Sequence, residues 1–383
     1  MGFDISLWNY IDADKYAFAA KKLVGEWKRL NVTIGCSFVC DGSPVQVKAT
    51  RKLVAVAKRA GMGMLIYDKR VFWKNYKNKG KEAYEKDVAS ALSDFGKYEN
   101  VVGYILSDEP DKASLPFVGE ALDVFKRLTD KVGFVNFSWC DARSAEYGNR
   151  ENYGEELAVF AKERLSLISN DRYSCMHARD YEEGFLETGV DKFFADLNFF
   201  KGVADRTGLA YWTSLLSVGH WMYRTPSEAD IRWQLSVSFA HGAKGIQWFF
   251  LNQHRQADDY YEYPVDIYGN RTPLFGCLER QTRVFLDKVS KPLDGYAMKR
   301  VWHTGKAYGG TPLLKEGDGE VFVYSDHSQN GILSEFERAG KKAYLIVNND
   351  QRYPEVFFIR FPGDASKNYH IWLDCGGTHI VWI

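Results

Sequence analysis

Two neighbouring carboxylates stand at the end of an apolar run. Residues 101–110, VVGYILSDEP, open with side chains suited to a buried strand and close with Asp108, Glu109 and Pro110. A run of this kind predicts a strand covered on both faces, as in a parallel sheet. Two adjacent carboxylates resist burial, and a proline ends the hydrogen-bond ladder. We therefore expect a core strand that delivers acids to its tip for chemistry, with a helix N-cap and a first-turn acid as the structural alternative.

Polar and aromatic side chains follow other apolar runs as well. They are Trp8, Asp68, Arg70, Trp73, Asn136, Trp139, Asp141, Asp171, Tyr173, His220, Trp221, Arg224, Gln247, Trp248, Asn252 and His254. Each has an ordinary structural explanation, because a single tryptophan usually packs and an Asp–Arg pair is usually a surface ion pair. Several tryptophans beside carboxylates and amides instead indicate a site that stacks on flat ligand faces and hydrogen-bonds to hydroxyl groups.

Short apolar segments alternate with amphipathic ones along the first two thirds of the chain. We predict strands at residues 2–8, 32–39, 62–68, 101–107, 132–139, 165–171, 210–218 and 245–251. Their centres recur every 29 to 45 residues, which is the length of one strand, one helix and two loops. Eight such units in about 250 residues favour a (β/α)8 TIM barrel, and an open doubly wound sheet stays the alternative.

The best-marked helix is expected over residues 225–242. Thr225 is predicted to cap it, Pro226 suits the first helical position, and Glu228 would complete a capping box. Gly242 follows the expected end, where glycine commonly terminates a helix.

After residue 290 the pattern changes to strands alone. We predict strands at residues 320–326, 331–337, 341–350, 355–361, 369–374 and 379–383, separated by Gly, Asn and Asp turns. The sequence therefore predicts a (β/α)8 barrel domain over residues 1–290 and a small C-terminal antiparallel β-sandwich over residues 291–383.

Composition narrows the classes of function. The 383 residues carry 50 basic and 50 acidic side chains, so the charge balance indicates neither nucleic acid nor membrane as a partner. No segment has the roughly 18 uncharged apolar residues that a transmembrane span needs. The opening residues lack the basic and apolar regions of a signal peptide. Localisation and oligomeric state stay open, since a leader removed from an exported bacterial precursor would leave no trace.

Cysteine usage and motifs indicate no metal or nucleotide chemistry. The six cysteines are scattered without a CxxC pair, which predicts free thiols and no disulfide framework. The chain contains no HExxH motif, no P-loop, no EF-hand loop and no GxGxxG after a predicted strand. We therefore expect no metal and no organic cofactor.

A barrel also predicts where the site lies. In (β/α)8 enzymes the active site is built from the loops that follow the carboxyl ends of the strands. Asp108 and Glu109 occupy the end of the fourth predicted strand. Because all strand ends of one kind meet at one face, we also expect Trp139, Trp221 and Trp248 to line one pocket with Glu109.

The segments at these positions resemble glycoside hydrolases. Residues 103–110, GYILSDEP, are similar to the acid-bearing strand-four motif of glycoside hydrolases with (β/α)8 barrels, usually Asn-Glu-Pro in their large retaining clan. VNFSW (135–139), LISNDRYS (167–174) and residues 224–250 resemble the fifth, sixth and final barrel segments of glycosidases similar to the family 42 β-galactosidases. GNRTPLF (269–275) and the C-terminal strands fit the same pattern, so the resemblance covers nearly the whole chain.

The resemblance implies roles for single residues. Glu109 would be the proton donor, and Asp108 takes the place of the substrate-contacting Asn. The clan has a second Glu, the nucleophile, at the end of strand seven, but residues 210–220 contain no acid. The second carboxylate is then expected from Asp171 on strand six, an arrangement found in other barrel glycosidases, with Asp141 and Asp108 as the next candidates. The residues expected to bind substrate are Trp8, Asp68, Asp108, Asn136, Trp139, Asp141, Tyr173, His220, Trp221, Arg224, Gln247 and Trp248.

Glycosidic cleavage needs a protonated carboxylic acid beside the leaving oxygen and an ionised carboxylate near the anomeric carbon. Acids crowded in an aromatic pocket would keep the donor protonated. A separation of about 5–5.5 Å between the carboxyls predicts retention, and about 6.5–9.5 Å predicts inversion. We therefore predict a glycosidase. A carbohydrate-binding protein on the same scaffold is the alternative, because of the missing strand-seven acid. A phosphate-ester enzyme is disfavoured, since the turns after strands seven and eight lack a Gly-rich cradle.

Overall fold

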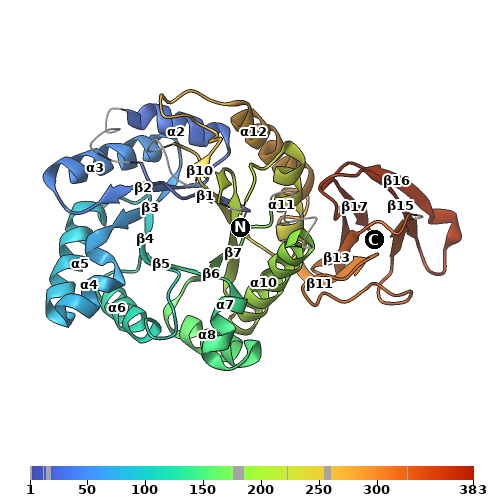
Figure 1. Ribbon diagram of the computed structural model, residues 1–383, viewed down its shortest axis with the longest axis horizontal. Helices are drawn as coiled ribbons and strands as arrows, with labels where there is room; N and C mark the ends of the chain where they lie inside the picture. Colours follow the sequence, from blue (N-terminus) through green and yellow to red (C-terminus); the bar gives the residue numbers. More distant parts are fainter. Residues whose placement is uncertain are drawn as a thin grey trace.

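The computed structural model shows a barrel followed by a β-domain (Figure 1). The residues that the structure describes are 2–11, 13, 19–175, 185–221, 223–253, 260–325 and 327–383. Within these ranges no helix combines the length and the apolar character that crossing a membrane requires.

Parallel strands form an eight-stranded barrel wall. They are β1 (Asp4–Leu7), β2 (Ile34–Cys40), β3 (Gly63–Asp68), β4 (Val101–Asp108), β5 (Val132–Phe137), β6 (Leu167–Asp171), β7 (Ala210–Leu216) and β9 (Gly245–Phe249). Their order, β1-β9-β7-β6-β5-β4-β3-β2, places the first strand beside the last. Between β1 and β2, the Thr33 amide donates to the Ile5 carbonyl at 2.9 Å and the Ile5 amide donates to Thr33 Oγ1 at 3.0 Å. The ring is thus nearly closed and the barrel prediction is confirmed, because an open doubly wound sheet keeps its first strand in the middle.

Helices surround the wall (Figure 1). They are α2 (Ala20–Arg29), α3 (Pro44–Arg59), η2 (Lys69–Val71), α4 (Trp73–Lys79), α5 (Lys81–Phe95), α6 (Leu115–Leu128), α7 (Cys140–Ser144), η3 (Ala145–Tyr147), α8 (Arg150–Arg164), α10 (Phe185–Thr207), α11 (Glu228–Ala240), α12 (Pro273–Phe285) and η4 (Leu286–Ser290). Each long helix packs an apolar stripe on the wall; in α3 this stripe includes Val47, Leu53 and Ala57. The packed layer holds the strands and leaves the loops at the strand ends to carry function.

Helix α11 begins two residues later than its expected cap. Ser227 is the N-cap: its Oγ accepts from the Asp230 amide at 3.2 Å, and the Asp230 carboxylate accepts from the Ser227 amide at 2.7 Å. The expected box of Thr225 and Glu228 is therefore wrong. Both pairs fit the local pattern, but Asp230 is also held by the Arg224 guanidinium at 2.5 and 2.7 Å, which favours the later register.

Side chains alternate between the two faces of each wall strand. On β9, Ile246 and Trp248 pack in the layer under the helices, whereas Phe249 packs with the cluster inside the barrel. On β3, Ile66 faces the helices and Tyr67 faces the interior. This alternation decides which of the predicted residues can reach a site at the mouth.

The C-terminal part is a two-sheet antiparallel sandwich, as predicted. One sheet contains β11 (Ala297–Thr304), β13 (Gly331–Arg338), β14 (Lys341–Asn348) and β17 (Thr378–Trp382). The other contains β12 (Phe322–Ser325), β15 (Glu355–Arg360) and β16 (Tyr369–Leu373), with η5 (Ala365–Lys367) between the last two. Leu333 from the first sheet and Phe357 from the second share one apolar core. Strand β11 was not predicted, because Lys299 and Arg300 interrupt its apolar pattern at a bulge.

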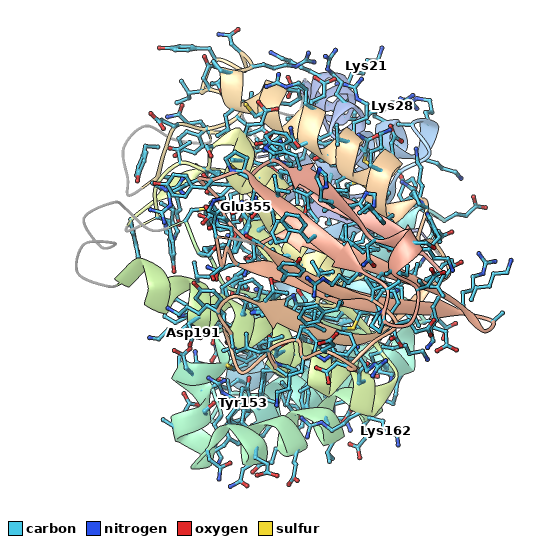
Figure 2. The ribbon with its side chains drawn as sticks, turned by 90° about the vertical axis from the view of Figure 1, so that its right-hand side faces the viewer. Lys21, Lys28, Tyr153, Lys162, Asp191 and Glu355 are labelled. Atoms are coloured by element: carbon cyan, nitrogen blue, oxygen red, sulfur yellow. The ribbon has the colours of Figure 1, made fainter. Side chains whose placement is uncertain are left out.

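The sandwich packs on the barrel through α11. Figure 2 views the molecule with the sandwich toward the reader. The rings of Phe239 and Phe336 stack at 5.4 Å, and Trp233 Nε1 donates to Asn349 Oδ1 at 2.8 Å. The last barrel helix runs into η4, which ends at Ser290, and β11 follows from residue 297. One hydrophobic core continues from the barrel into the sandwich. The division of the chain into two domains at residue 290 therefore stays a prediction.

Candidate active site

Three carboxylates meet at the carboxyl end of the barrel. Asp108 is the last residue of β4, Glu109 follows it, and Asp171 is the last residue of β6. The side chains of Asp171 and Glu109 share a hydrogen bond, and the Asp108 charge acts on both Asp171 and the neighbouring tyrosines. The expected meeting of the strand-four and strand-six acids is thus present in the structure.

The backbone at Glu109 explains how two consecutive residues serve one site. Neighbouring residues of a regular strand point to opposite faces. Here the pairing of β4 with β5 shifts between Ile105 and Ser107, and Glu109 adopts a left-handed conformation with φ of 48°. Such a conformation costs a non-glycine residue about 1–2 kcal/mol. The Glu109 amide still donates to the Asn136 carbonyl at 2.8 Å, so the turn is held while both acids reach the mouth.

Asp108 is held by an amide relay. Asn136 Nδ2 donates to Asp108 Oδ1 at 3.1 Å, and Ser169 Oγ donates to Asn136 Oδ1 at 2.9 Å. The serine contact fixes which end of the amide faces the acid. Burial, opposed by the Asn136 hydrogen bond and reinforced by the Glu109 charge, raises the pKa of Asp108 to about 6. Asp108 is therefore ionised at neutral pH and protonated in mildly acidic solution.

Asp171 is the acid that favours a proton most strongly. Burial raises the pKa of Asp171 well above its ordinary value, and the charges of Glu109 and Asp108 raise it further. The hydrogen bond to Glu109 acts in the same direction, because two carboxyl groups can share it only when one is protonated. Burial, the neighbouring charges and this contact thus all favour the protonated form of Asp171.

Tyrosines form the wall around the acids. Tyr10 and Tyr173 both lie within range of the Asp108 and Asp171 charges. Tyr67 lies near Asp108, and burial raises its pKa to about 12. Tyr10 and Tyr67 were not among the predicted residues. The alternation of β3 would have selected Tyr67 over Asp68 once the inward face was known.

Trp8 and Tyr173, both predicted, contribute to this wall. Trp8 is buried beneath the mouth, its ring lies parallel to that of Tyr10 at 6.2 Å, and its Nε1 donates to Ser214 Oγ at 3.2 Å. Tyr173 is buried and meets the Tyr223 ring edge-on at 5.5 Å. Trp8 thus supports the ring that faces the acids.

A short hairpin places two predicted residues at the rim. Strands β8 (Gly219–His220) and β10 (Tyr260–Tyr261) pair there, and the His220 ring stacks on Tyr260 at 4.5 Å. Trp221 occupies the tip with a left-handed backbone and 60% of its surface exposed. His254, also proposed for the rim, lies outside the described residues.

Trp139 and Asp141 belong to a separate charged cluster at the rim. The Arg172 guanidinium lies over the Trp139 ring at 4.7 Å and pairs with Asp141 at 2.8 Å. Lys192 approaches Asp141 at 3.5 Å. Although burial opposes it, these cations lower the pKa of Asp141. Asp141 is thus occupied by two cations.

Three predicted residues point away from the acids. Trp248 is fully buried among the helices, so its expected place in the pocket is wrong; the inward neighbours on β9 are Gln247 and Phe249. Asp68 is buried on the helix side of β3 in a 2.7 Å ion pair with Arg70. The Arg224 guanidinium is committed to Asp230, as described above.

Gln247 faces the barrel interior on β9, beside Phe249. It is fully buried and stands in register with Ser6 on β1 and Ser214 on β7. Ser214 also stands in register with Asp171 on β6, so Gln247 lies at the level of that acid, and its contact with a ligand stays a prediction. Trp73 lies in the helix layer, and Asn252 bridges to Val265.

The structure also bears on metals and thiols. Within the described ranges, no grouping of His, Cys, Asp and Glu side chains has the arrangement of a metal site. All six cysteines are free thiols.

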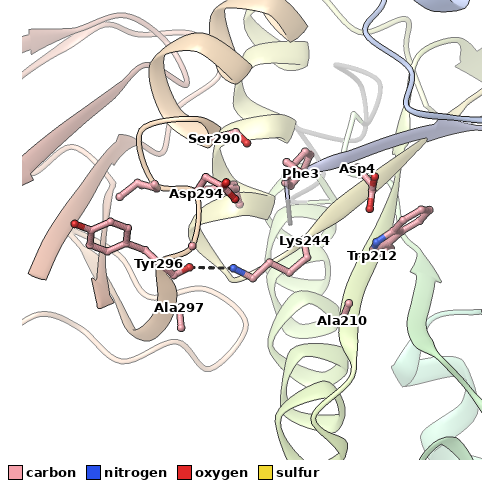
Figure 3. Close-up of a pocket in the computed structure, with 13 residues that line it drawn as sticks. Phe3, Asp4, Ala210, Trp212, Lys244, Ser290, Asp294, Tyr296 and Ala297 are labelled. Carbon is pink, nitrogen blue, oxygen red and sulfur yellow. Dashed lines mark hydrogen bonds between the residues drawn. The ribbon is translucent and has the colours of Figure 1, made fainter. Parts of the chain in front are cut away.

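A cavity lies at the end of the barrel opposite the acids (Figure 3). It encloses about 340 Å³ between the starts of β1, β7 and β9 and the segment that leads to the sandwich. Its walls include Phe3, Trp212 and Phe239, and Lys244 Nζ donates to the Tyr296 carbonyl at 3.2 Å. The amino ends of barrel strands serve stability and not catalysis in this fold.

Comparison with known proteins identifies the fold. No protein-family model matches the chain, and no curated protein matches it in sequence. Solved structures that share its fold include a β-galactosidase from the psychrophilic Marinomonas ef1 (9% identity, TM-score 0.56, 73% of this chain and 59% of that one). Another is the β-galactosidase from the haloarchaeon Halorubrum lacusprofundi (11%, 0.54, 74% and 58%). A third is a GH5_18 protein from Bifidobacterium longum in complex with Manb1-4GlcNAc (8%, 0.54, 74% and 78%).

The chain spans less than two thirds of the length of either β-galactosidase. At these identities the likeness shows the fold, a (β/α)8 barrel with a following β-domain. The structural neighbours are glycoside hydrolases.

Proposed function

We propose that the protein is a glycoside hydrolase that acts on oligo- or polysaccharides. The observation that carries the proposal is the joint position of Asp108, Glu109 and Asp171 at the carboxyl end of the barrel, inside a wall of tyrosines. Glycosidic cleavage needs a carboxylic acid that keeps its proton at working pH and a second, ionised carboxylate close by. In this cluster Asp171 favours its protonated form, and Asp108 can be the ionised carboxylate.

In this proposal Glu109 is the proton donor. Glu109 is exposed to the mouth, whereas its hydrogen-bonded partner Asp171 is shielded, so a proton on the pair can reach a leaving oxygen through Glu109. The second carboxylate is Asp171 or Asp108. Asp141 is the weaker candidate, because two cations occupy it. The more specific likeness to family 42 β-galactosidases is part of this proposal, and it rests on residues 135–139, 167–174 and 224–250.

A carbohydrate-binding protein on the same scaffold is the second candidate. The observation that favours it is the absence of any acid from residue 209 to residue 227, the segment that contains β7 and its following loop. Retaining barrel enzymes of the resembled clan place their nucleophile there. Without a working nucleophile the tyrosine wall and Trp221 would bind a sugar without cleaving it.

Turnover of aryl glycosides separates the two candidates. Release of the aryl group from any member of a panel of 4-nitrophenyl glycosides, lost in Glu109→Gln and retained in Glu155→Gln on the exposed face of α8, supports the hydrolase. Binding of a sugar by calorimetry, without turnover of any member, supports the binding protein and contradicts the hydrolase.

A further inference from the structure

Asn136 on β5 contacts both acids at the end of β4. Its backbone carbonyl accepts from the Glu109 amide at 2.8 Å, and its side-chain Nδ2 donates to Asp108 Oδ1 at 3.1 Å. Asn136 and Asp108 stand opposite each other where β4 and β5 pair. One residue of the neighbouring strand therefore supports the left-handed turn of Glu109 and the carboxylate of Asp108 at the same time.

Both ends of the Asn136 side chain are engaged inside the barrel wall. The side chain is fully buried, whereas Asp108 is half-buried and Glu109 is exposed. Its Nδ2 donates to Asp108, and its Oδ1 accepts from Ser169 Oγ, which is also fully buried, at 2.9 Å. The amide thus lies behind the two acids and acts on Asp108 directly.

Among the described residues, no cation acts on Asp108. The titratable groups that act on it, or on which its charge acts, are Glu109, Asp171, Tyr10, Tyr67 and Tyr173. Each of these is either neutral or negatively charged. Burial and the Glu109 charge raise the pKa of Asp108, and of the described groups only Asn136 lowers it, because an amide N–H stabilises the carboxylate that accepts from it.

We infer that Asn136 is a positioning residue, which keeps Asp108 ionised through its side chain while its backbone carbonyl holds Glu109 beside it. The inference rests on the proposed hydrolase function, in which Asp108 is a candidate for the ionised carboxylate. Asn136 then sets the lower pH limit of the reaction without touching the substrate. Below that limit Asp108 takes up a proton and can neither attack the sugar nor activate a water.

Two substitutions of Asn136 test this role. Asn136→Leu keeps a side chain of similar size without any polar atom, Asn136→Ala is the smaller alternative, and both retain the backbone carbonyl that holds Glu109. The acidic limb of the kcat/KM–pH profile, on a 4-nitrophenyl glycoside that the parent hydrolyses, should move to higher pH by about 1–2 units, because a hydrogen bond to a charged group is lost. KM at the pH optimum should stay close to that of the parent, since the substrate loses no contact.

Asn349→Ala in the sandwich is the matched control. Asn349 is also buried, and its Oδ1 accepts from Trp233 Nε1 at 2.8 Å, so the variant loses a buried hydrogen bond but should keep the acidic limb of the parent. Carbon-13 NMR of the free protein, labelled at the Asp carboxyl carbons, needs no turnover. The Asp108 signal, identified by its absence in Asp108→Asn, should titrate about 1–2 pH units higher in the Asn136 variants than in the parent.

An Asp108 titration that is the same in the parent and in both Asn136 variants overturns the inference. A kcat/KM that falls by the same factor at every pH, with an unshifted limb, also overturns it and makes Asn136 a substrate contact. Both results leave the hydrolase proposal standing, as long as the parent releases the aryl group. If the parent turns over no glycoside although sugars bind, the hydrolase proposal fails, and the NMR titration alone decides whether Asn136 keeps Asp108 ionised.

Discussion

Lowering the pH from 7 to 5 should weaken the fold through two buried histidines. His241, the C-cap of α11, and His303, in β11, are 1% and 0% exposed and join the barrel to the sandwich. Their Nε2 atoms lie 3.4 Å apart. Phe194 packs on both rings at 4.9 and 4.8 Å, and Tyr308 covers His303.

The partners assign the protons of a neutral pair. His241 Nδ1 lies 2.9 Å from the Val237 carbonyl and therefore carries hydrogen, which leaves its Nε2 as an acceptor. His303 Nδ1 accepts from the Tyr308 amide at 3.1 Å, so its Nε2 donates to His241. Protonation of either ring would set two donors against each other. Burial lowers the pKa of His241 to about 4, and burial together with the neighbouring His241 lowers that of His303 to about 2.

The sign and the size of the effect follow by linkage. Both folded-state pKa values lie below the ordinary 6.5, so the stability is complete above pH 6.5 and is lost as the pH falls toward 4. Each pH unit in that window costs about 1.4 kcal/mol per histidine. From pH 6.5 to 5 the loss is about 2 kcal/mol for each ring and about 4 kcal/mol for the pair. Asp108 and Asp196, whose burial raises their pKa to about 6, act in the opposite direction.

Urea unfolding at pH 7 and pH 5 isolates the histidine contribution. His303→Gln removes one proton-binding group. When the pH falls from 7 to 5, the free energy of unfolding should therefore decrease in both proteins, but by about 2 kcal/mol less in His303→Gln than in the parent. His370→Gln, at an exposed position of β16, is the control and should behave like the parent. An identical pH dependence in the parent and His303→Gln would refute the reasoning, whatever the absolute stability of the variant.

Further outcomes are expected at the site. Glu109→Gln should lower hydrolysis of a glycoside with a poor leaving group by about 10²–10⁴-fold, and of an activated aryl glycoside much less, in steady-state kinetics. Asp171→Asn should lower the hydrolysis of poor and activated substrates alike, because a nucleophile or base is needed whatever group departs; unchanged turnover would pass that role to Asp108. Trp248→Ala should destabilise the fold by about 3–5 kcal/mol in urea. Trp221→Ala should weaken sugar binding while changing stability by about 0.5 kcal/mol or less; the reverse pattern contradicts the assignment of faces.

The periodicity of the sequence was sufficient to predict the architecture. The spacing of apolar segments located all the wall strands, and the change after residue 290 located the sandwich. Parallel strands buried on both faces must be apolar runs, so this signal is strong. Strand β11 was not predicted, because charged residues interrupt its apolar pattern. The cap of α11 was misplaced because two overlapping capping patterns are equal in sequence, and only the ion pair of Arg224 with Asp230 distinguishes them.

The sequence also located the acids at strand ends, but not which side chains join them. Trp248 and Asp68 were expected at the mouth and face the helices, while Tyr67 and Tyr10 lie there instead. Adjacent residues of a strand point to opposite faces, so a shift of one residue reverses every assignment. The local sequence does not reveal that shift at β4, where the change of register and the left-handed Glu109 arise from pairing with β5. The hydrogen bond between Glu109 and Asp171, like the contact of His241 with His303, joins residues far apart in the chain, and only the tertiary fold brings them together.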